Sequence, residues 1–219
     1  EVRRLLFAGQ YAQAEALANA TMMATPKKQM PYQPLGDLVL DFFEISETNG
    51  YRRELDLDTA VATSTFEARG LQHRREVFIS PVDQCIAVRL SGDKAKRISL
   101  RIGLDSDQQD ATVVADGDAS LLLHGRNQAA FGIEGKLKFA LRLRVLTTGG
   151  RLRQHGDRIE VRAADEVVLL LTAATSYKRF DDVSGDPESI TRAQLDKASA
   201  KSWATLRDAH IAAHQRMFQ

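Results

Sequence analysis

A period-two alternation of apolar and polar residues runs through the middle of the chain, from residue 37 to about residue 175. Its clearest stretch lies at residues 136–145, where Leu137, Phe139, Leu141, Leu143 and Val145 alternate with Lys136, Lys138, Ala140, Arg142 and Arg144. Side chains of a β-strand point alternately to opposite faces of the sheet. The stretch therefore predicts a long strand with one core face and one solvated face.

Further strands follow from the same pattern. Residues 37–42 place Leu38, Leu40 and Phe42 on one face, and residues 97–104 alternate Ile98, Leu100, Ile102 and Leu104 with Arg97, Ser99, Arg101 and Gly103. Residues 167–171 are apolar without alternation, so we expect a central strand that is buried on both faces. Turn signals such as Asn49-Gly50 and Gly149-Gly150 separate the runs, and no helical pattern intervenes. Together these features predict a mainly β fold, an antiparallel sandwich.

Helical patterns flank this β region. Residues 1–23 predict two short helices with a break at Gly9, and residues 23–36 predict a loop that contains Pro26, Pro31 and Pro34. After Ser176 the helical pattern returns, with Asp186 as the N-cap and Pro187 at the first helical position. An apolar stripe at helical spacing follows, made of Trp203, Leu206, His210, Ala213 and Met217.

Composition excludes several classes of protein. Lys plus Arg is 30 and Asp plus Glu is 29, so no charge excess indicates binding to nucleic acid or to an anionic membrane. The longest apolar run, residues 167–171, is far shorter than the ~20 residues that span a bilayer. Cys85 is the single cysteine, so an intrachain disulfide is excluded. Residues 1–4 lead directly into a helical pattern, and we expect the chain to begin inside a longer gene product.

No metal or cofactor is expected. His210 and His214 lie four residues apart, which places both on one helical face, but no Glu follows His210 and no third ligand is evident. The sequence contains neither a glycine-rich phosphate loop nor a GxSxG nucleophile elbow. Cys85 falls in a strand pattern, where a cysteine is more often a packed apolar residue than a nucleophile.

Paired carboxylates could hydrolyse a glycosidic bond, one as acid and the other as base or nucleophile. Alternation places Asp56 and Asp58 on one face and Leu55 and Leu57 on the other, although a solvated face that ends in a turn is the favoured interpretation. For the acidic loop with Asp181, Asp182 and Asp186, helix capping and solvation are favoured. Four arginines are anion-site candidates that more often decorate solvated strand faces: Arg52, Arg53, Arg74 and Arg75.

The order of several motifs resembles family 95 of the glycoside hydrolases, the α-L-fucosidase type. The motifs are residues 1–16 (EVRRLLFAGQYAQAEA), 32–38 (YQPLGDL), 51–60 (YRRELDLDTA), 75–80 (REVFIS), 83–84 (DQ), 88–91 (VRLS), 174–177 (ATSY), 185–187 (GDP) and 206–218. They follow one another over nearly the whole chain. The resemblance implies an N-terminal β super-sandwich at residues 1–180, with 1–23 as a helical lead-in, and the start of a helical linker at 181–219.

Members of that family cleave terminal α-L-fucosides with inversion, and some relatives act on α-L-galactosides. Their catalytic groups belong to an α/α barrel that would follow residue 219, so the resemblance implies no catalytic residue in this chain. It implies the barrel and a fucosylated oligosaccharide as partners, without nucleic acid or membrane, and a periplasmic or secreted parent protein. The family's opening stretch does not occur before Glu1, so first strands of the sandwich are expected to be absent. An exposed sheet edge would then favour self-association.

Two hypotheses about sugar binding remain open. Tyr32 and Gln33 carry side chains that suit stacking on a sugar and hydrogen bonding to its hydroxyls, and they would help to wall the sugar pocket of the barrel. The alternative for residues 32–36 is a strand lead-in that is fixed by its prolines. The other functional class is an independent carbohydrate-binding β-sandwich, for which an exposed aromatic cluster is expected. Aromatic residues are only 6% of the chain and are predicted to alternate mostly inward, which argues against that class.

Overall fold

The computed structural model describes residues 1–25, 28–43, 45, 47–95 and 98–218, in two compact units. One unit comprises residues 1–33 and 129–135. It contains α1 (Val2–Phe7) and α2 (Tyr11–Thr21), and Gly9 between them adopts a positive φ of 70°. The prediction of two short helices with a break at Gly9 is therefore confirmed. Leu5 and Ala14 are buried in this helical pair.

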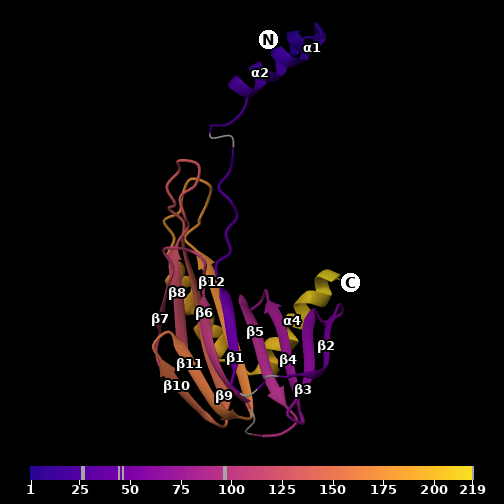
Figure 1. Cartoon of the computed structure of the whole chain (residues 1–219), viewed down its shortest axis with the longest axis vertical. Helices are drawn as coiled ribbons and strands as arrows, with labels where there is room; N and C mark the ends of the chain where they lie inside the picture. The colour runs from indigo at the N-terminus through magenta and orange to yellow at the C-terminus, as the bar shows by residue number, and fades with distance from the viewer. Residues whose placement is uncertain (26–27, 44, 46, 96–97, 219) are drawn as a thin grey trace. The chain divides into compact units, whose positions relative to one another are not determined.

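The other unit, residues 34–128 and 136–219, contains two antiparallel sheets (Figure 1). The smaller sheet has the order β1 (Asp37–Phe42), β6 (Ile98–Asp105), β11 (Arg158–Ala164) and β10 (Arg151–His155). The larger sheet has the order β2 (Asn49–Asp56), β3 (Val61–Ala68), β4 (Leu71–Ser80), β5 (Cys85–Gly92), β12 (Glu166–Thr175), β9 (Lys138–Thr148), β8 (Ser120–Arg126) and β7 (Thr112–Ala115). This architecture confirms the mainly β, antiparallel sandwich.

The main core lies between the two sheets, where the predicted inward residues meet. Leu100, Ile102 and Leu104 of β6 are fully buried and belong to the same cluster as Leu143 and Val145 of β9. In β1, Leu38, Leu40 and Phe42 are half-buried against this cluster. Arg97, which was expected at the start of the β6 pattern, lies outside the described residues.

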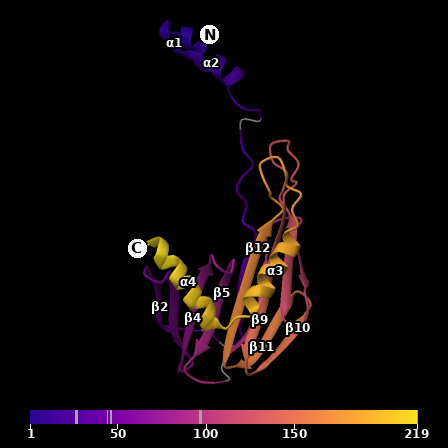
Figure 2. The same ribbon diagram turned by 180° about the vertical axis from the view of Figure 1, so that it is seen from behind.

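Figure 2 shows that α3 (Pro187–Ser199) and α4 (Trp203–Phe218) lie across the outer face of the larger sheet. A second core lies under these helices. Strand β12 contributes to both cores because its side chains alternate. Val167, Leu169 and Leu171 belong to the core between the sheets, and Val168 and Leu170 to the core under the helices. The prediction of a central strand that is buried on both faces is confirmed.

The outer face of β9 was predicted to be solvated; Lys136 and Lys138 are exposed as predicted, but the prediction was wrong for the middle of the strand. Ala140 is fully buried and Arg142 is only 1% exposed, because α3 packs across this face. The buried Arg142 guanidinium forms an ion pair with Asp116, which also pairs with Arg192 of α3 at 3.1 Å. Alternation alone marks which residues share a face, and here it did not reveal that a helix covers the polar one.

The helical boundaries follow the predicted capping chemistry. Asp186 caps α3 by accepting a hydrogen bond from the Ser189 backbone N–H at 3.1 Å, with Pro187 in the first turn. In α4 the apolar stripe is buried at Leu206, His210 and Ala213, whereas its last member, Met217, is 74% exposed. Among the described helices, none combines the length and the apolar character that a membrane span requires.

Candidate functional site

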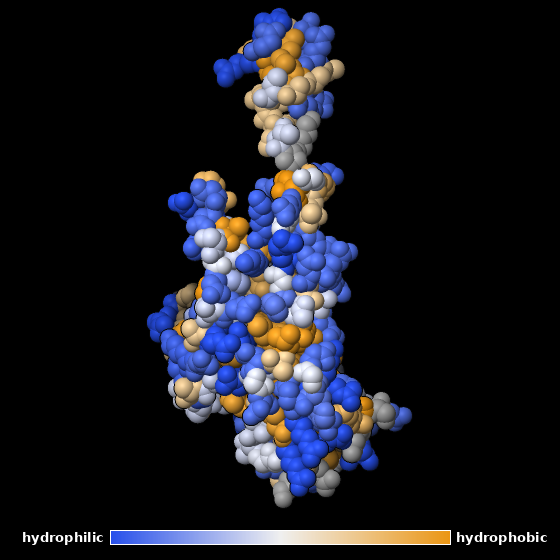
Figure 3. Space-filling view, turned by 90° about the vertical axis from the view of Figure 1, so that its left-hand side faces the viewer, coloured by the Kyte–Doolittle hydropathy of each residue, from blue (hydrophilic) through white to orange (hydrophobic). Residues whose placement is uncertain are grey.

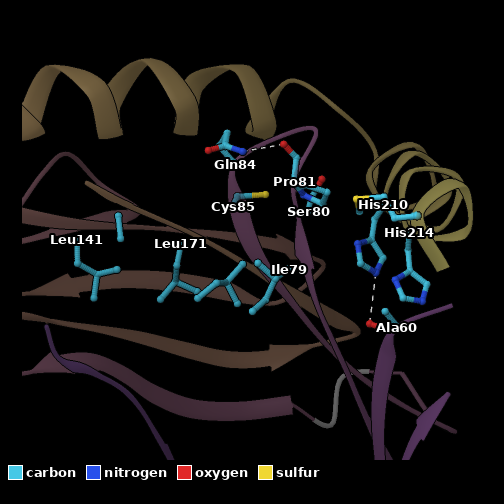
Figure 4. A pocket seen from close by; sticks show the side chains of 13 residues that line it. Ala60, Ile79, Ser80, Pro81, Gln84, Cys85, Leu141, Leu171, His210 and His214 are labelled. Carbon is cyan, nitrogen blue, oxygen red and sulfur yellow. Dashed lines mark hydrogen bonds between the residues drawn. The ribbon is translucent and has the colours of Figure 1, made fainter. Parts of the chain in front are cut away.

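An apolar groove of about 440 Å³ opens at the end of the larger sheet, around the turn between β4 and β5 (Figure 4). Its lining consists of Ala60, Ile79, Ser80, Pro81, Gln84, Cys85, Ile86, Leu141, Leu171, Ala173, His210, His214 and Met217. None of these residues carries a carboxylate. The groove therefore lacks the acid and base that glycoside hydrolysis by paired carboxylates requires.

The two histidines of α4 attach the helix to the turn between β2 and β3. Nε2 of His210 lies 3.3 Å from the Ala60 carbonyl oxygen, and Nε2 of His214 lies 2.8 Å from that of Leu57. The rings also stack, with 6.4 Å between the two histidine centroids and 4.8 Å between those of His210 and Phe78. Within the described part of the chain, no group of three or more His, Cys, Asp or Glu side chains could hold a metal ion.

Cys85 at the start of β5 is a packed core residue, as its strand pattern predicted. It is 3% exposed and belongs to the core under the helices. Burial, together with the nearby Asp83 carboxylate, raises the pKa of the Cys85 thiol to about 11. A thiol with such a pKa remains protonated at neutral pH, so Cys85 has no thiolate with which to act as a nucleophile.

Asp83, next to the groove, is a buried carboxylate that the sequence marked only as part of the motif at residues 83–84, without a predicted role. Its side chain accepts a hydrogen bond from Ser80 Oγ at 3.0 Å and forms an ion pair with Lys201, which lies between α3 and α4. The Asp83 backbone N–H in turn donates to Ser80 Oγ at 3.1 Å. This closed set of bonds ties the β4–β5 turn to the helices, and we interpret Asp83 as structural.

Asp56 and Asp58 lie in different local structures. Strand β2 ends at Asp56, and Asp58 lies in the following turn, so the predicted alternation does not extend to it. The Asp56 carboxylate accepts hydrogen bonds from the backbone N–H groups of Asp58 at 2.9 Å and Thr59 at 3.3 Å. The pKa of Asp56 is lowered, mainly by a hydrogen bond from the Thr59 side chain and further by these backbone hydrogen bonds. Together they outweigh the desolvation that would raise it. The favoured interpretation, a solvated strand that ends in a turn, is confirmed.

The acidic loop before α3 is likewise committed to local bonds. Asp182 accepts from the Ser184 N–H at 2.9 Å, and Asp186 accepts from both the N–H and the hydroxyl of Ser189. Asp186 and Glu188 line a cleft of about 210 Å³, where Glu188 lies 3.4 Å from Nδ1 of His124. The capping interpretation of Asp182 and Asp186 is confirmed, and Asp181 forms an exposed ion pair with Arg179.

The four candidate arginines point to opposite faces of the larger sheet. The ladder places Arg52, Thr65 and Arg74 in one cross-strand row. It places Arg53, Ser64 and Arg75 in the next row, which faces the other way. Arg52 and Arg74 each pair with an acidic residue two positions along their own strands. The four arginines therefore do not converge on one face of the sheet.

The two predicted sugar-binding residues precede β1. Tyr32 is completely exposed and Gln33 is half-buried, and both belong to the helical unit. The loop is fixed from residue 34 onward, since Gln108 donates to the Pro34 carbonyl at 2.9 Å and Ser106 donates to that of Leu35 at 2.8 Å. At Gly36 a Cβ would lie 2.6 Å from the Asp105 carbonyl oxygen, so only glycine fits there. The role of Tyr32 and Gln33 stays a hypothesis.

The prediction that aromatic side chains mostly alternate inward was wrong. Eight of the fourteen are exposed: Phe7, Tyr11, Tyr32, Tyr51, Phe131, Tyr177, Phe180 and Phe218. Most of them lie in helices, turns and loops, to which strand alternation does not apply. Tyr177 and Phe180 share one loop, at 57% and 91% exposure.

Comparison with known proteins identifies the domain type. The family model described as Glycosyl hydrolase family 65, N-terminal domain, matches residues 1–179. Among curated relatives, the chain is similar to "Alpha-L-fucosidase 2" of Arabidopsis thaliana, with 27% identity in an alignment of 243 residues. The alignment covers 100% of this chain and 28% of the relative. It is also similar to "Probable alpha-fucosidase A" of Aspergillus niger, with 26% identity over 200 residues that cover 85% of this chain and 25% of the relative.

A solved structure with the same fold is "Putative kojibiose phosphorylase from human microbiome", with a TM-score of 0.58 and 11% identity over 83% of this chain and 28% of that one. The chain thus spans about a quarter of the length of the proteins it matches. These findings confirm the glycoside hydrolase N-terminal domain, although the matching family model is that of family 65. The chain belongs to the family of glycosyl hydrolase family 65 N-terminal domains.

Proposed function

We propose that this chain is the non-catalytic N-terminal β-domain of an enzyme that cleaves terminal α-L-fucosides with inversion. Its partners are the catalytic α/α barrel of its own polypeptide and the fucosylated oligosaccharide that the intact enzyme binds. The observation that carries the proposal is the match, over the whole chain, to about a quarter of a relative named as an α-L-fucosidase.

The chemistry of the described side chains supports a scaffold role. The candidate carboxylates Asp56, Asp182 and Asp186 accept local backbone hydrogen bonds. The largest of the grooves described above is apolar. An inverting glycosidase needs an acid and a base roughly 6.5–9.5 Å apart on either side of the sugar. We place that pair in the barrel and assign this domain to packing against it.

The reaction itself is tested on the full-length polypeptide with an aryl α-L-fucoside. Proton NMR during the first minutes distinguishes the initial anomer of the released fucose. Initial β-L-fucose supports inversion, whereas initial α-L-fucose would contradict it. Turnover of an aryl α-L-galactoside but not of the fucoside would contradict the proposed substrate.

We further propose that Tyr32 and Gln33 help to wall the sugar site. The exposed phenol ring of Tyr32 is suited to stack on the apolar face of a sugar, and the Gln33 amide is suited to bond its hydroxyls. In the full-length enzyme, Gln33→Ala is expected to raise KM or lower kcat for the fucoside. A matched control is Gln154→Ala, which removes an amide on β10 whose Nε2 donates to the Gly156 carbonyl. If Gln33→Ala leaves both constants unchanged, the idea is wrong.

An independent carbohydrate-binding module is the second candidate, favoured by the exposed aromatic pair Tyr177 and Phe180 in one loop. Aromatic side chains stack on sugars without any catalytic group. Titration of the isolated chain with L-fucose and fucosylated glycans, read by calorimetry, separates the candidates. Binding that is lost in Phe180→Ala would favour the module, and the absence of binding would favour the scaffold.

A further inference from the structure

The two sheets of the sandwich differ in extent, because four strands face eight. Within the described part of the chain, the core between the sheets draws its buried residues from β5, β12, β9 and β8 of the larger sheet. Strands β2 and β3 contribute none. In Figure 1, β2 to β4 lie to one side of β1, away from the other strands of the smaller sheet. The inner face of β2–β4, the face that β5 turns toward the smaller sheet, is therefore only partly covered: His73 of β4 is buried there, whereas Ile79 of β4 and Leu55 of β2 are exposed.

Burial decreases stepwise along one cross-strand row of this inner face. The ladder aligns Leu169, Val88, Val77, Ala62 and Leu55 across five neighbouring strands, from β12 to β2. Leu169 is fully buried and Val88 is 5% exposed, whereas Val77 and Ala62 are half-buried. Leu55, at the end of the row, is 61% exposed. The residues of this row are therefore still apolar at positions that the smaller sheet does not cover.

A second row shows the same decrease. Leu143, Leu171, Ile86 and Ile79 are aligned from β9 to β4. Leu143 is fully buried and Leu171 is 4% exposed, Ile86 is half-buried, and Ile79 is 66% exposed. The solvated face of an antiparallel sheet normally carries polar residues. This apolar face continues the interface between the two sheets, and beside Ile79 it leads into the 440 Å³ groove. An exposed apolar face of this kind indicates a binding site for a further partner.

The edge of β1 adjoins this face. Among the described strands, β1 is paired only with β6, so its other edge presents unpaired backbone groups. A hollow of about 240 Å³ lies beside Phe42 at the end of β1, between it and His73 and Leu71 of β4. A strand added to this edge would continue the smaller sheet over β4 and β3.

Arg75 indicates which polar side chain a partner of this face would carry. It lies in the row of Arg53, Ser64 and Leu90 on the same inner face. Its Nε is buried and has no hydrogen-bond partner among the described residues. A guanidinium group is suited to bind a carboxylate, and a buried donor without an acceptor is costly. The surface therefore pairs apolar rows with one site for an acidic side chain.

We propose that this inner face and the free edge of β1 bind one or more β-strands from the part of the polypeptide outside residues 1–219. Such a strand pairs with β1, places alternate apolar side chains on the rows of Leu55 and Ile79, and brings a carboxylate to Arg75. The interface continues the existing contact between the two sheets of one polypeptide. A second copy is less suited to this place, because the smaller sheet of each copy is already packed on its own larger sheet.

Cysteine labelling tests whether the face is covered. Cys85, the single native cysteine of residues 1–219, is 3% exposed, so it contributes little background. Ile79→Cys and, as a control, Val114→Cys on β7 at the opposite edge are made in the isolated chain and in the full-length polypeptide. Labelling of each position by a maleimide is followed by peptide mass spectrometry, which separates these sites from other cysteines.

We expect both positions to react readily in the isolated chain, where Val114 is 39% exposed and Ile79 66%. In the full-length polypeptide, the labelling rate of Ile79→Cys should fall to roughly one tenth or below, since labelling then requires local opening. The labelling rate of Val114→Cys should be unchanged. Equal rates for Ile79→Cys in the two proteins would overturn the proposal. Equal protection at both positions would also overturn it.

A benzophenone maleimide attached at Ile79→Cys identifies what covers the face. The expected crosslinked peptide lies outside residues 1–219, in the same molecule, with alternating apolar residues and a nearby Asp or Glu. A crosslink that doubles the mass would show that a second copy covers the face. A crosslink within residues 1–219 would show that another part of this chain covers it. A crosslink to a peptide whose apolar residues recur at helical spacing would show that a helix, and not a strand, covers it. Any of these overturns the proposal. Neither readout depends on fucosidase activity.

Discussion

Asp116→Asn should destabilise the domain strongly, because it removes the counter-charge of a buried cation. Arg142 is 1% exposed in the middle of β9, and its guanidinium pairs with the Asp116 carboxylate. Its other bond is weak, since Nη2 lies 3.5 Å from the Glu188 carbonyl oxygen. Removing one partner of a buried pair typically costs about 3–5 kcal/mol. The Asp116 side chain is 14% exposed, so we expect the lower end, about 3 kcal/mol.

Urea unfolding, followed by the fluorescence of Trp203, measures this loss in the isolated chain. Trp203 is the single tryptophan and packs on Phe78 with 5.0 Å between ring centroids. A loss of about 3 kcal/mol lowers the urea midpoint by roughly 1–1.5 M for a typical slope of ~2–3 kcal/mol/M. The matched control is Asp118→Asn in the same turn, where the side chain is exposed and a change within about 0.5 kcal/mol is expected.

Arg142→Met separates charge from packing. It removes the buried cation and leaves Asp116 paired with the exposed Arg192, so it should cost less than Asp116→Asn. The reasoning is refuted if Asp116→Asn costs no more than Asp118→Asn, or if Arg142→Met costs more than Asp116→Asn.

The same pair predicts a pH dependence. Desolvation alone would raise the pKa of Asp116, but the hydrogen bonds and charges of Arg142 and Arg192 outweigh it and hold that pKa below its ordinary value. A depressed folded pKa stabilises the domain above the unfolded pKa of ~3.9, and this stabilisation is lost as the pH falls through the folded value. The difference in stability between the native chain and Asp116→Asn should therefore shrink below pH ~4. A difference that stays constant down to pH 3 would contradict this assignment.

Further predictions concern the helices and Cys85. Leu195→Ala under α3 should cost about 2–5 kcal/mol in urea unfolding, whereas Ile190→Ala, on a side chain that is 41% exposed, should cost less than about 1 kcal/mol; equal costs would contradict the packing of α3. Asp186→Ala should lower the thermal midpoint because α3 loses its N-cap bond to Ser189, and an unchanged midpoint would show that the cap is dispensable. Cys85 should resist an aromatic disulfide reagent at pH 8 in the folded chain and react in urea, since burial raises its pKa to about 11; rapid reaction when folded would contradict its burial.

Much of the β-fold could be predicted because strand periodicity records which residues face the core. The alternation in β6 and β9 identified the inward residues, and the apolar run of β12 identified a strand that is buried on both faces. The polar face of β9 could not be assigned from periodicity. Arg142 has the residue type of a solvated position, and its burial depends on Asp116 and on α3, which are distant in sequence.

The candidate site was less predictable, since it depends on what lies opposite each face. The turn chemistry at Asp186 was readable because capping is local, whereas the pairing of Asp83 with Lys201 joins residues far apart in sequence. The exposure of Ile79 was not visible either, because its strand pattern is that of a core residue. It is exposed because no described strand covers β4 on that face.

The most direct test of the central claim compares hydrolysis of an aryl α-L-fucoside by the isolated chain and by the full-length polypeptide at equal molar concentration. Turnover is expected from the full-length polypeptide alone. With the isolated chain, even at high concentration, the fucoside should be hydrolysed no faster than in buffer without protein. Turnover by the isolated chain would contradict the central claim and would place the catalytic groups within residues 1–219, with Asp56, Asp58 and Asp181 as the first residues to replace.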